Sequence, residues 1–220
     1  MNPLETVKRS LIMFFLGLPL IIISIVFFLG IGLGNAGLLF LSLGHIISVP
    51  AVVLVCHFIT GFIPNRFVDV PYSDIGQLVP SVPVSAFTTE TNVYPSYWMA
   101  HFTFFCSYIL FNAVEVYDLP PISDLDDYLA KVQARTSRAM VIMIFTIAIF
   151  FALTFIRLRY THTEHIFGVL FSTVVFGAFG YGWLKASSAL GIRTMDIFGV
   201  AQQMLLVRDP SIPTTCVNQT

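Results

Sequence analysis

Between Arg9 and Arg66 the chain contains no Asp, Glu, Lys or Arg, so residues 10–65 form one long uncharged stretch. About 20 mostly apolar residues are enough to cross a hydrocarbon core about 30 Å thick, and this stretch can therefore supply two membrane helices and a turn. The turn is predicted at residues 32–35, where two glycines and an asparagine interrupt the apolar run. The sequence thus predicts an N-terminal helical hairpin over residues 1–63 that lies in a lipid bilayer.

The composition of the whole chain agrees with a membrane location. Only 10% of the residues are charged and 56% are hydrophobic, whereas about 25% of the residues of a typical soluble domain are charged. The formal net charge is -1 and the basic residues are scattered, unlike the basic patch that binds nucleic acid. We therefore expect an integral membrane protein that contacts the lipid bilayer and binds no nucleic acid.

The apolar runs predict an all-α, polytopic transmembrane fold that forms a single membrane domain over residues 1–220. Pro19 and Pro50 fall inside the first two spans, and each is expected to kink its helix because proline lacks the amide hydrogen that the helix uses. An odd number of spans would place the two termini on opposite sides of the membrane. The five predicted spans are residues 11–31, 36–63, 95–117, 139–156 and 166–184, the last three within a segment over residues 95–184.

Three segments connect or follow these spans. Residues 64–94 are rich in proline and serine and are expected to form a water-facing loop. Within residues 118–138 a short interfacial helix is predicted near 124–134, because a serine precedes it in the capping position and apolar side chains share one face. A second interfacial helix is predicted near 196–206, within the tail of residues 185–220.

Two sets of residues are predicted to position the spans. Small residues four positions apart in the fifth span let a neighbouring helix approach closely. These predicted packing residues are Gly168, Ser172, Ala178 and Gly182. Aromatic and basic side chains near the ends of spans are predicted to anchor the protein at the lipid headgroups. These predicted interface anchors are Trp98, Tyr117, Arg157, Arg159, Trp183 and Lys185.

Three histidines at membrane depth, His45, His57 and His101, are the candidate cofactor ligands. A haem with two axial imidazoles needs histidines from facing helices, which the second and third predicted spans could supply. The alternative is that each histidine bonds to a carbonyl or hydroxyl group, or lies near the interface, because an unpartnered polar group in lipid is costly. We expect no bound cofactor and no metal, and haem is kept as the alternative.

A polar turn between the fourth and fifth spans suggests one enzyme alternative, a lipid-phosphate phosphatase of the phosphatidic acid phosphatase type. Arg159 lies six residues before His165, which is the spacing of that family's arginine and general base. Other positions do not match, since Leu158 stands where the family has serine and Val169 where it has aspartate. A phosphoryl-transfer site needs several cations and an oriented base. The turn is therefore predicted to be a solvated basic anchor, and the protein is predicted not to be an enzyme.

Two parts of the sequence resemble known proteins. The first covers residues 94–105, with the run Tyr-Trp-Met-Ala-His-Phe-Thr-Phe-Phe, and residues 111–113; the second covers residues 177–183, Gly-Ala-Phe-Gly-Tyr-Gly-Trp, and residues 193–200. They resemble uncharacterised integral membrane proteins of large nucleocytoplasmic DNA viruses of algae and other protists. Such viruses carry a lipid membrane beneath an icosahedral capsid. The resemblance therefore implies a component of a virion inner membrane that anchors capsid proteins.

The sequence thus predicts a structural, non-enzymatic membrane protein of a virion inner membrane, with an organellar membrane as the alternative location. Its expected partners are other membrane or capsid proteins of a large assembly. The alternatives are a membrane redox subunit that binds haem through histidines, and the lipid-phosphate phosphatase. The expected partner surfaces are the loop at 64–94, the surface helix at 124–134 and the tail after Asp196.

Overall fold

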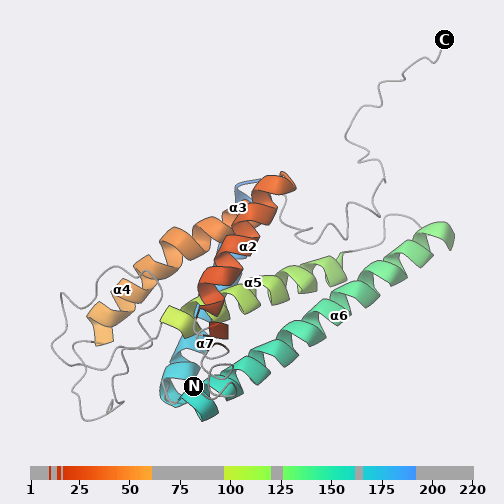
Figure 1. Ribbon diagram of the computed structural model, residues 1–220. Helices are drawn as coiled ribbons and strands as arrows, with labels where there is room; N and C mark the ends of the chain where they lie inside the picture. Colours follow the sequence, from red (N-terminus) through yellow and green to blue (C-terminus); the bar gives the residue numbers. More distant parts are fainter. Residues whose placement is uncertain are drawn as a thin grey trace.

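The chain folds entirely into helices in the part that the structure, a computed structural model, describes: residues 10, 14–15, 17–60, 97–119, 126–161 and 166–191. The elements in chain order are α2 (Leu18–Gly32), α3 (Ala36–Leu43), η1 (Gly44–Ser48), α4 (Val49–Thr60), α5 (Tyr97–Asp118), α6 (Asp126–Ile156), η5 (Arg157–Thr161) and α7 (Ile166–Ala189). Both η elements are wide π-helical turns that continue the helix before them. The predicted all-α fold is confirmed (Figure 1).

Four stretches of the described helices are long and apolar enough to cross a membrane, so the chain is a polytopic membrane protein. They are Ala36–Cys56, Tyr97–Asp118, Val132–Arg159 and Gly168–Ala189, and they correspond to the second to fifth predicted spans. α2 is a further apolar helix of 15 residues. At about 1.5 Å per residue it is about 22 Å long, which is shorter than a hydrocarbon core. The predicted first span began at residue 11, and residues 11–13 lie outside the described part of the chain.

The first helices form the predicted hairpin. The chain turns at Gly34, whose positive φ of 61° is a left-handed conformation that glycine adopts without steric cost. Asn35 then caps α3, because its side-chain oxygen accepts a hydrogen bond from the Leu38 amide at 3.2 Å. A Cβ at Gly30 would lie 3.0 Å from the Leu39 backbone nitrogen, so α2 and α3 approach closely there. We call α2, α3, η1 and α4 together the hairpin.

The two prolines that were predicted to kink spans have different positions. Pro19 lies in the first turn of α2, where the helix needs no amide hydrogen, so it does not interrupt α2. Pro50 lies two residues after η1, in which the Val49 amide bonds to the Gly44 carbonyl five residues back instead of four. A wide turn relieves the clash that a proline ring makes with the preceding turn of a regular helix. The distortion expected at Pro50 is therefore a π-turn.

The predicted interfacial helix near 124–134 is helical, but it continues directly into the span predicted at 139–156 as the single helix α6. No glycine or proline occurs within α6, so no residue favours a break between the two parts. Arg135, at the junction, is only 4% exposed, and its guanidinium donates a hydrogen bond to the carbonyl of Leu119 just after α5. This contact holds the first part of α6 against the end of α5.

Two further predicted elements lie outside the described residues. These are the loop at 64–94 and the interfacial helix at 196–206.

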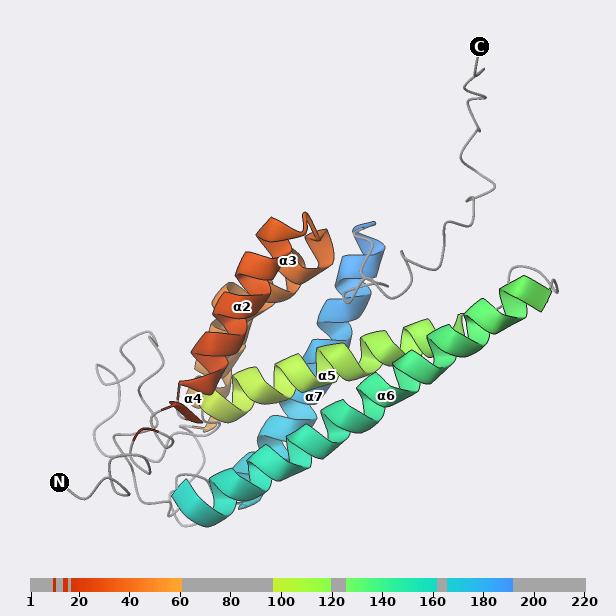
Figure 2. The ribbon, with the colours of Figure 1, turned by 45° about the vertical axis from the view of Figure 1, so that its right-hand side comes forward.

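α5 is the central helix of the described structure. It packs most extensively on α7 and α6 and also contacts α4 and α2, and Figure 2 shows it running beside α6 and across α7. In the membrane-crossing stretches, 72% of α5 is buried but only 11% of α6, the most apolar of the four. This order is expected in lipid, because outer helices face hydrocarbon while a central helix can carry polar groups. We call α5, α6, η5 and α7 together the three-helix unit.

α7 packs on α5 through Gly180, a residue that the sequence analysis did not select. A Cβ at Gly180 would lie only 2.8 Å from the Phe104 carbonyl oxygen of α5. About one turn earlier in α7, the Gly177 carbonyl accepts a hydrogen bond from the Ser107 hydroxyl at 2.6 Å. Close backbone approach and a bond between helices are the usual ways in which membrane helices associate.

The predicted packing residues of the fifth span divide into two groups. Gly168 and Ser172 are buried, whereas Ala178 and Gly182 lie on the exposed face of α7. No atom lies within 4 Å of the position that a Cβ would take at Gly182. Within the described residues Gly182 therefore packs against no other helix, and a contact of Ala178 and Gly182 with another chain stays a prediction.

Successive long helices run in opposite directions through the molecule (Figures 1 and 2). The turn of the hairpin, the end of α5 and the end of α7 consequently lie at one end of the bundle. The ends of α4 and α6 lie at the other. The arrangement therefore predicts which residues lie on the same side of a membrane.

We expect single cysteines at Leu33 and Leu190 to react with a membrane-impermeant maleimide from the same side of sealed vesicles, and a cysteine at Arg159 to react from the opposite side. All three positions are exposed, and the first two lie at the opposite end of the bundle from the third. The assay uses a Cys216→Ser background, because the two cysteines among the described residues are buried. Labelling of all three positions from one side would contradict the alternating arrangement.

We expect Gly180→Ala to lower the free energy of unfolding by about 1–3 kcal/mol, because the added methyl group meets a backbone oxygen that cannot rotate away. Thermal unfolding in detergent measures the effect. Gly182→Ala is the matched control on the same helix; it should preserve or slightly raise stability, since alanine favours a helix over glycine by about 1 kcal/mol. Equal destabilisation by both substitutions would show that α5 and α7 do not meet at Gly180.

Candidate functional site

The first turns of α5 hold a buried aromatic cluster around Trp98, which is only 1% exposed. The Trp98 indole Nε1–H donates to the Phe15 carbonyl at 3.0 Å, and the two ring centroids lie 5.0 Å apart. Phe102 contacts Trp98 on one side and stacks on Phe150 of α6 on the other, with centroids 5.8 Å apart. Trp98 therefore links the residues before α2 to α5, and Phe102 extends the contact to α6.

Arg157 brings a positive charge into this cluster. It lies in η5 at the end of α6 and is 1% exposed, with its guanidinium carbon 4.8 Å from the centroid of the Trp98 ring. A cation over the face of an indole at this distance is attracted by the ring electrons, more strongly when both are shielded from water. Arg159, two residues later, is exposed. Of the two arginines predicted as anchors, one therefore lies inside the protein and one on its surface.

One turn along α5, His101 meets His45 of η1, and both side chains are buried, at 2% and 1% exposed. Their Nδ1 atoms are 3.1 Å apart, and their ring centroids are 5.4 Å apart with 18° between the ring planes. This centroid distance is about the greatest that two imidazoles with that separation of nitrogens can have. The two Nδ1 atoms therefore point at each other nearly head to head.

The surroundings of the histidine pair are mostly aromatic. The His45 ring lies 4.9 Å from Phe104 and 6.1 Å from Phe105, and the His101 ring lies 6.2 Å from Tyr97, all between centroids. The Nε2 atom of His45 makes no hydrogen bond within the described part of the chain. Nor do the described residues contain any group of three His, Cys, Asp or Glu side chains that could hold a metal ion.

This geometry does not favour a haem between His45 and His101. Bonds between a metal and an imidazole nitrogen are about 2 Å long, so two axial ligands place their nitrogens about 4 Å apart with the haem plane between the rings. The Nδ1 atoms of the pair are 3.1 Å apart, which is the length of an N–H···N hydrogen bond. His57, the third candidate ligand, lies in α4, and its side chain is outside the described residues.

The opposite end of α5 carries an ion pair with α7. The Lys185 Nζ atom lies 2.6 Å from Glu115 Oε1, and half of the lysine side chain is exposed. The same Nζ atom lies 5.5 Å from the centroid of the Tyr181 ring. Exposed ion pairs contribute little to stability, so this contact fixes the direction of the side chains rather than the packing of the helices.

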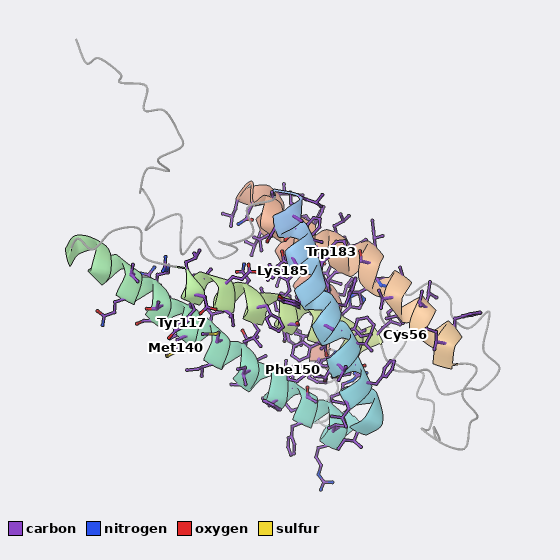
Figure 3. The ribbon with its side chains drawn as sticks, turned by 180° about the vertical axis from the view of Figure 1, so that it is seen from behind. Cys56, Tyr117, Met140, Phe150, Trp183 and Lys185 are labelled. Carbon is purple, nitrogen blue, oxygen red and sulfur yellow. The ribbon has the colours of Figure 1, made fainter. Side chains whose placement is uncertain are left out.

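Trp183 contacts the hairpin. Figure 3 shows it on α7, close to Lys185. Its Nε1–H donates to the Phe40 carbonyl of α3 at 3.0 Å, and it stacks on the Phe40 ring with centroids 4.6 Å apart. Tyr117, near the end of α5, is 40% exposed. Contact with lipid headgroups stays a prediction for all six anchors: Trp98, Tyr117, Arg157, Arg159, Trp183 and Lys185.

The residues of the phosphatase alternative are only partly described. Arg159 is exposed, and His165 lies outside the described residues together with His162 and Glu164. That alternative stays a prediction.

Both members of the histidine pair were predicted from the sequence, but several other residues that position α5 were not. Gly180 and Ser107 were not selected, because glycine and serine occur on every face of these helices. Pro50, five residues after His45, was a usable indication of the η1 turn, because proline disfavours a regular helical turn before it. Phe15 takes part through its backbone carbonyl, which no side-chain pattern can reveal.

Comparisons of the chain with models of protein families, with curated proteins and with solved structures found no match. The class that the fold and the site define is an all-helical, polytopic membrane protein. Its interior is organised by polar and aromatic side chains around α5.

We expect Arg157→Gln to lower the free energy of unfolding by about 2 kcal/mol, because the variant removes a buried cation from the face of Trp98. Arg159→Gln, a matched substitution two residues away at an exposed position, should change it by less than about 0.5 kcal/mol. Thermal unfolding of both variants in the same detergent provides the comparison. Equal losses would show that the charge of Arg157 is not used inside the protein.

Proposed function

We propose that the protein is a structural membrane protein that organises a larger assembly in its bilayer, and that this bilayer is the inner membrane of a virion. The all-helical polytopic fold supports a role within the membrane. The viral part of the proposal rests on the resemblance of residues 94–105 and 177–183 to membrane proteins of large DNA viruses.

The observation that carries the structural role is that interior polar side chains connect helices that are distant in sequence. Ser107 of α5 bonds to the backbone of α7, Trp183 of α7 to the backbone of α3, and Trp98 of α5 to the backbone before α2. In lipid the hydrophobic effect gives helices little reason to associate, so such bonds and close packing supply the cohesion. Such contacts between helices stabilise one arrangement of the bundle, which is what a structural role in an assembly requires.

The outer surface supports contacts inside the membrane. α6 contributes little to the interior, and five of its large apolar side chains are between 61% and 65% exposed. These side chains are Val141, Ile144, Phe145, Phe151 and Phe155. In the proposed assembly this face of α6 contacts lipid and neighbouring membrane proteins, and capsid proteins approach through the loop at 64–94 and the tail after Asp196.

We expect extraction of native particles in a mild detergent to yield this chain together with capsid or other membrane proteins in a fixed ratio. A photo-crosslinking residue at Phe145, which is 65% exposed on α6, should capture one of those neighbours. The matched control is the same residue at Phe176 of α7, which is 0% exposed and should react only within the chain. Mass spectrometry identifies the products.

Three outcomes would count against the proposal. Recovery of the chain alone, with no crosslinked neighbour, would remove the assembly role. A Soret band in the purified protein that is lost in His57→Ala or His101→Ala would replace the proposal with the redox subunit. Lipid-phosphate hydrolysis that is lost in Arg159→Ala and His165→Ala would replace it with the phosphatase.

A further inference from the structure

The contact between His45 and His101 joins the hairpin to α5 through a hydrogen bond. This bond depends on how many protons the two imidazole rings carry. An N–H···N hydrogen bond needs one Nδ1 atom that carries hydrogen and one that does not. The neutral pair meets this condition, and so does the pair with one added proton on the donor ring. A second added proton puts N–H on both facing nitrogens, which are 3.1 Å apart, and the bond becomes a repulsive contact.

No carboxylate of the described residues faces the pair to offset a second proton. Outside its two histidines the hairpin carries no titratable acid or base, apart from the thiol of Cys56. On α5, Tyr97 faces His101, and Glu115 lies 14 residues further along, about 21 Å away on the helix. On the α6 side, Arg157 lies over Trp98, one turn before His101.

Lys185 is the charged residue of the described part of α7, and it pairs with Glu115 at the other end of α5. The charges that the structure describes around the pair are therefore positive or distant. They add no attraction that would hold the two rings together once both are positively charged imidazolium ions.

We infer that the His45–His101 pair is an acid-opened latch between the hairpin and the three-helix unit. With no more than one added proton the latch holds η1 against α5. With two it opens, and the hairpin moves away. The hairpin is the part that yields, because its contacts with α5 are narrower than those that α5 makes with α6 and α7. This role goes beyond the proposed scaffold function and does not require it.

Trp183 lies at the same junction and can report on the latch. Its indole bonds to the Phe40 carbonyl, and a Cβ at Gly44, the residue before His45, would lie 2.7 Å from its Nε1 atom. Movement of η1 therefore changes the surroundings of this ring. The chain has two tryptophans, so labelling with 5-fluorotryptophan gives two ¹⁹F resonances, which a Trp183→Phe sample assigns.

The test is a titration of the full chain in lipid nanodiscs from about pH 7.5 to about pH 4 and back, a range that includes ordinary histidine titration. We expect a reversible shift of the Trp183 resonance in acid. The shift should be lost in the double variant His45→Asn/His101→Asn, because asparagine does not gain a proton. His57→Asn is the matched control on the same hairpin and should retain the shift.

Two outcomes would overturn the latch. One is a wild-type Trp183 resonance that does not respond to acid. The other is a shift that persists in the double variant, which would assign it to other groups such as Glu115. If the double variant does not fold, His101→Asn replaces it, since a single imidazole has no second ring N–H to face and the shift should again be lost.

Discussion

A helix that carries histidine, threonine, serine and asparagine side chains across a bilayer must shield them from hydrocarbon, and the rest of this structure depends on how α5 meets that condition. His101, Thr103, Ser107 and Asn112 are all at most 8% exposed. The other helices surround α5, and the most apolar of them, α6, takes the outermost position. The cost of exposing polar groups to lipid thus determines which helix is central, and the central helix then determines which side chains meet in the interior.

Both π-turns of the described chain bring a polar residue to α5. η1 presents His45 to His101, and η5 presents Arg157 to Trp98, one turn apart on the same helix. A π-turn adds a residue to one turn and so rotates the following side chains relative to a regular helix. In η1 the cause is visible in the sequence, because Pro50 disfavours a regular turn before it. For η5 no proline or glycine is present within the turn, so the sequence shows no comparable cause.

Hydropathy predicted the helices well, because the length of an apolar run and the thickness of a bilayer are directly related. It could not predict which face of each helix is buried. In a soluble protein the contrast between polar and apolar faces gives that information, but in lipid both faces of α7 are apolar. Gly180 and Gly182 are therefore alike in the sequence, although one touches α5 and the other touches no other described helix. Nor could hydropathy show that Trp98 and Arg157, both predicted as headgroup anchors, are buried and lie against each other.

The hairpin has no charged residue. An apolar surface alone gives a pair of helices no preferred depth or rotation in lipid, so hydropathy could not predict where the hairpin lies against the other helices. Three polar contacts with the three-helix unit fix the hairpin and the residues just before it: Phe15 with Trp98, Phe40 with Trp183 and His45 with His101. In the first two an indole N–H donates to a backbone carbonyl, and neither group gains or loses a proton near neutral pH. Only the third contact depends on protonation, so the position of the hairpin is set by two contacts that acid does not alter directly and one that acid can remove.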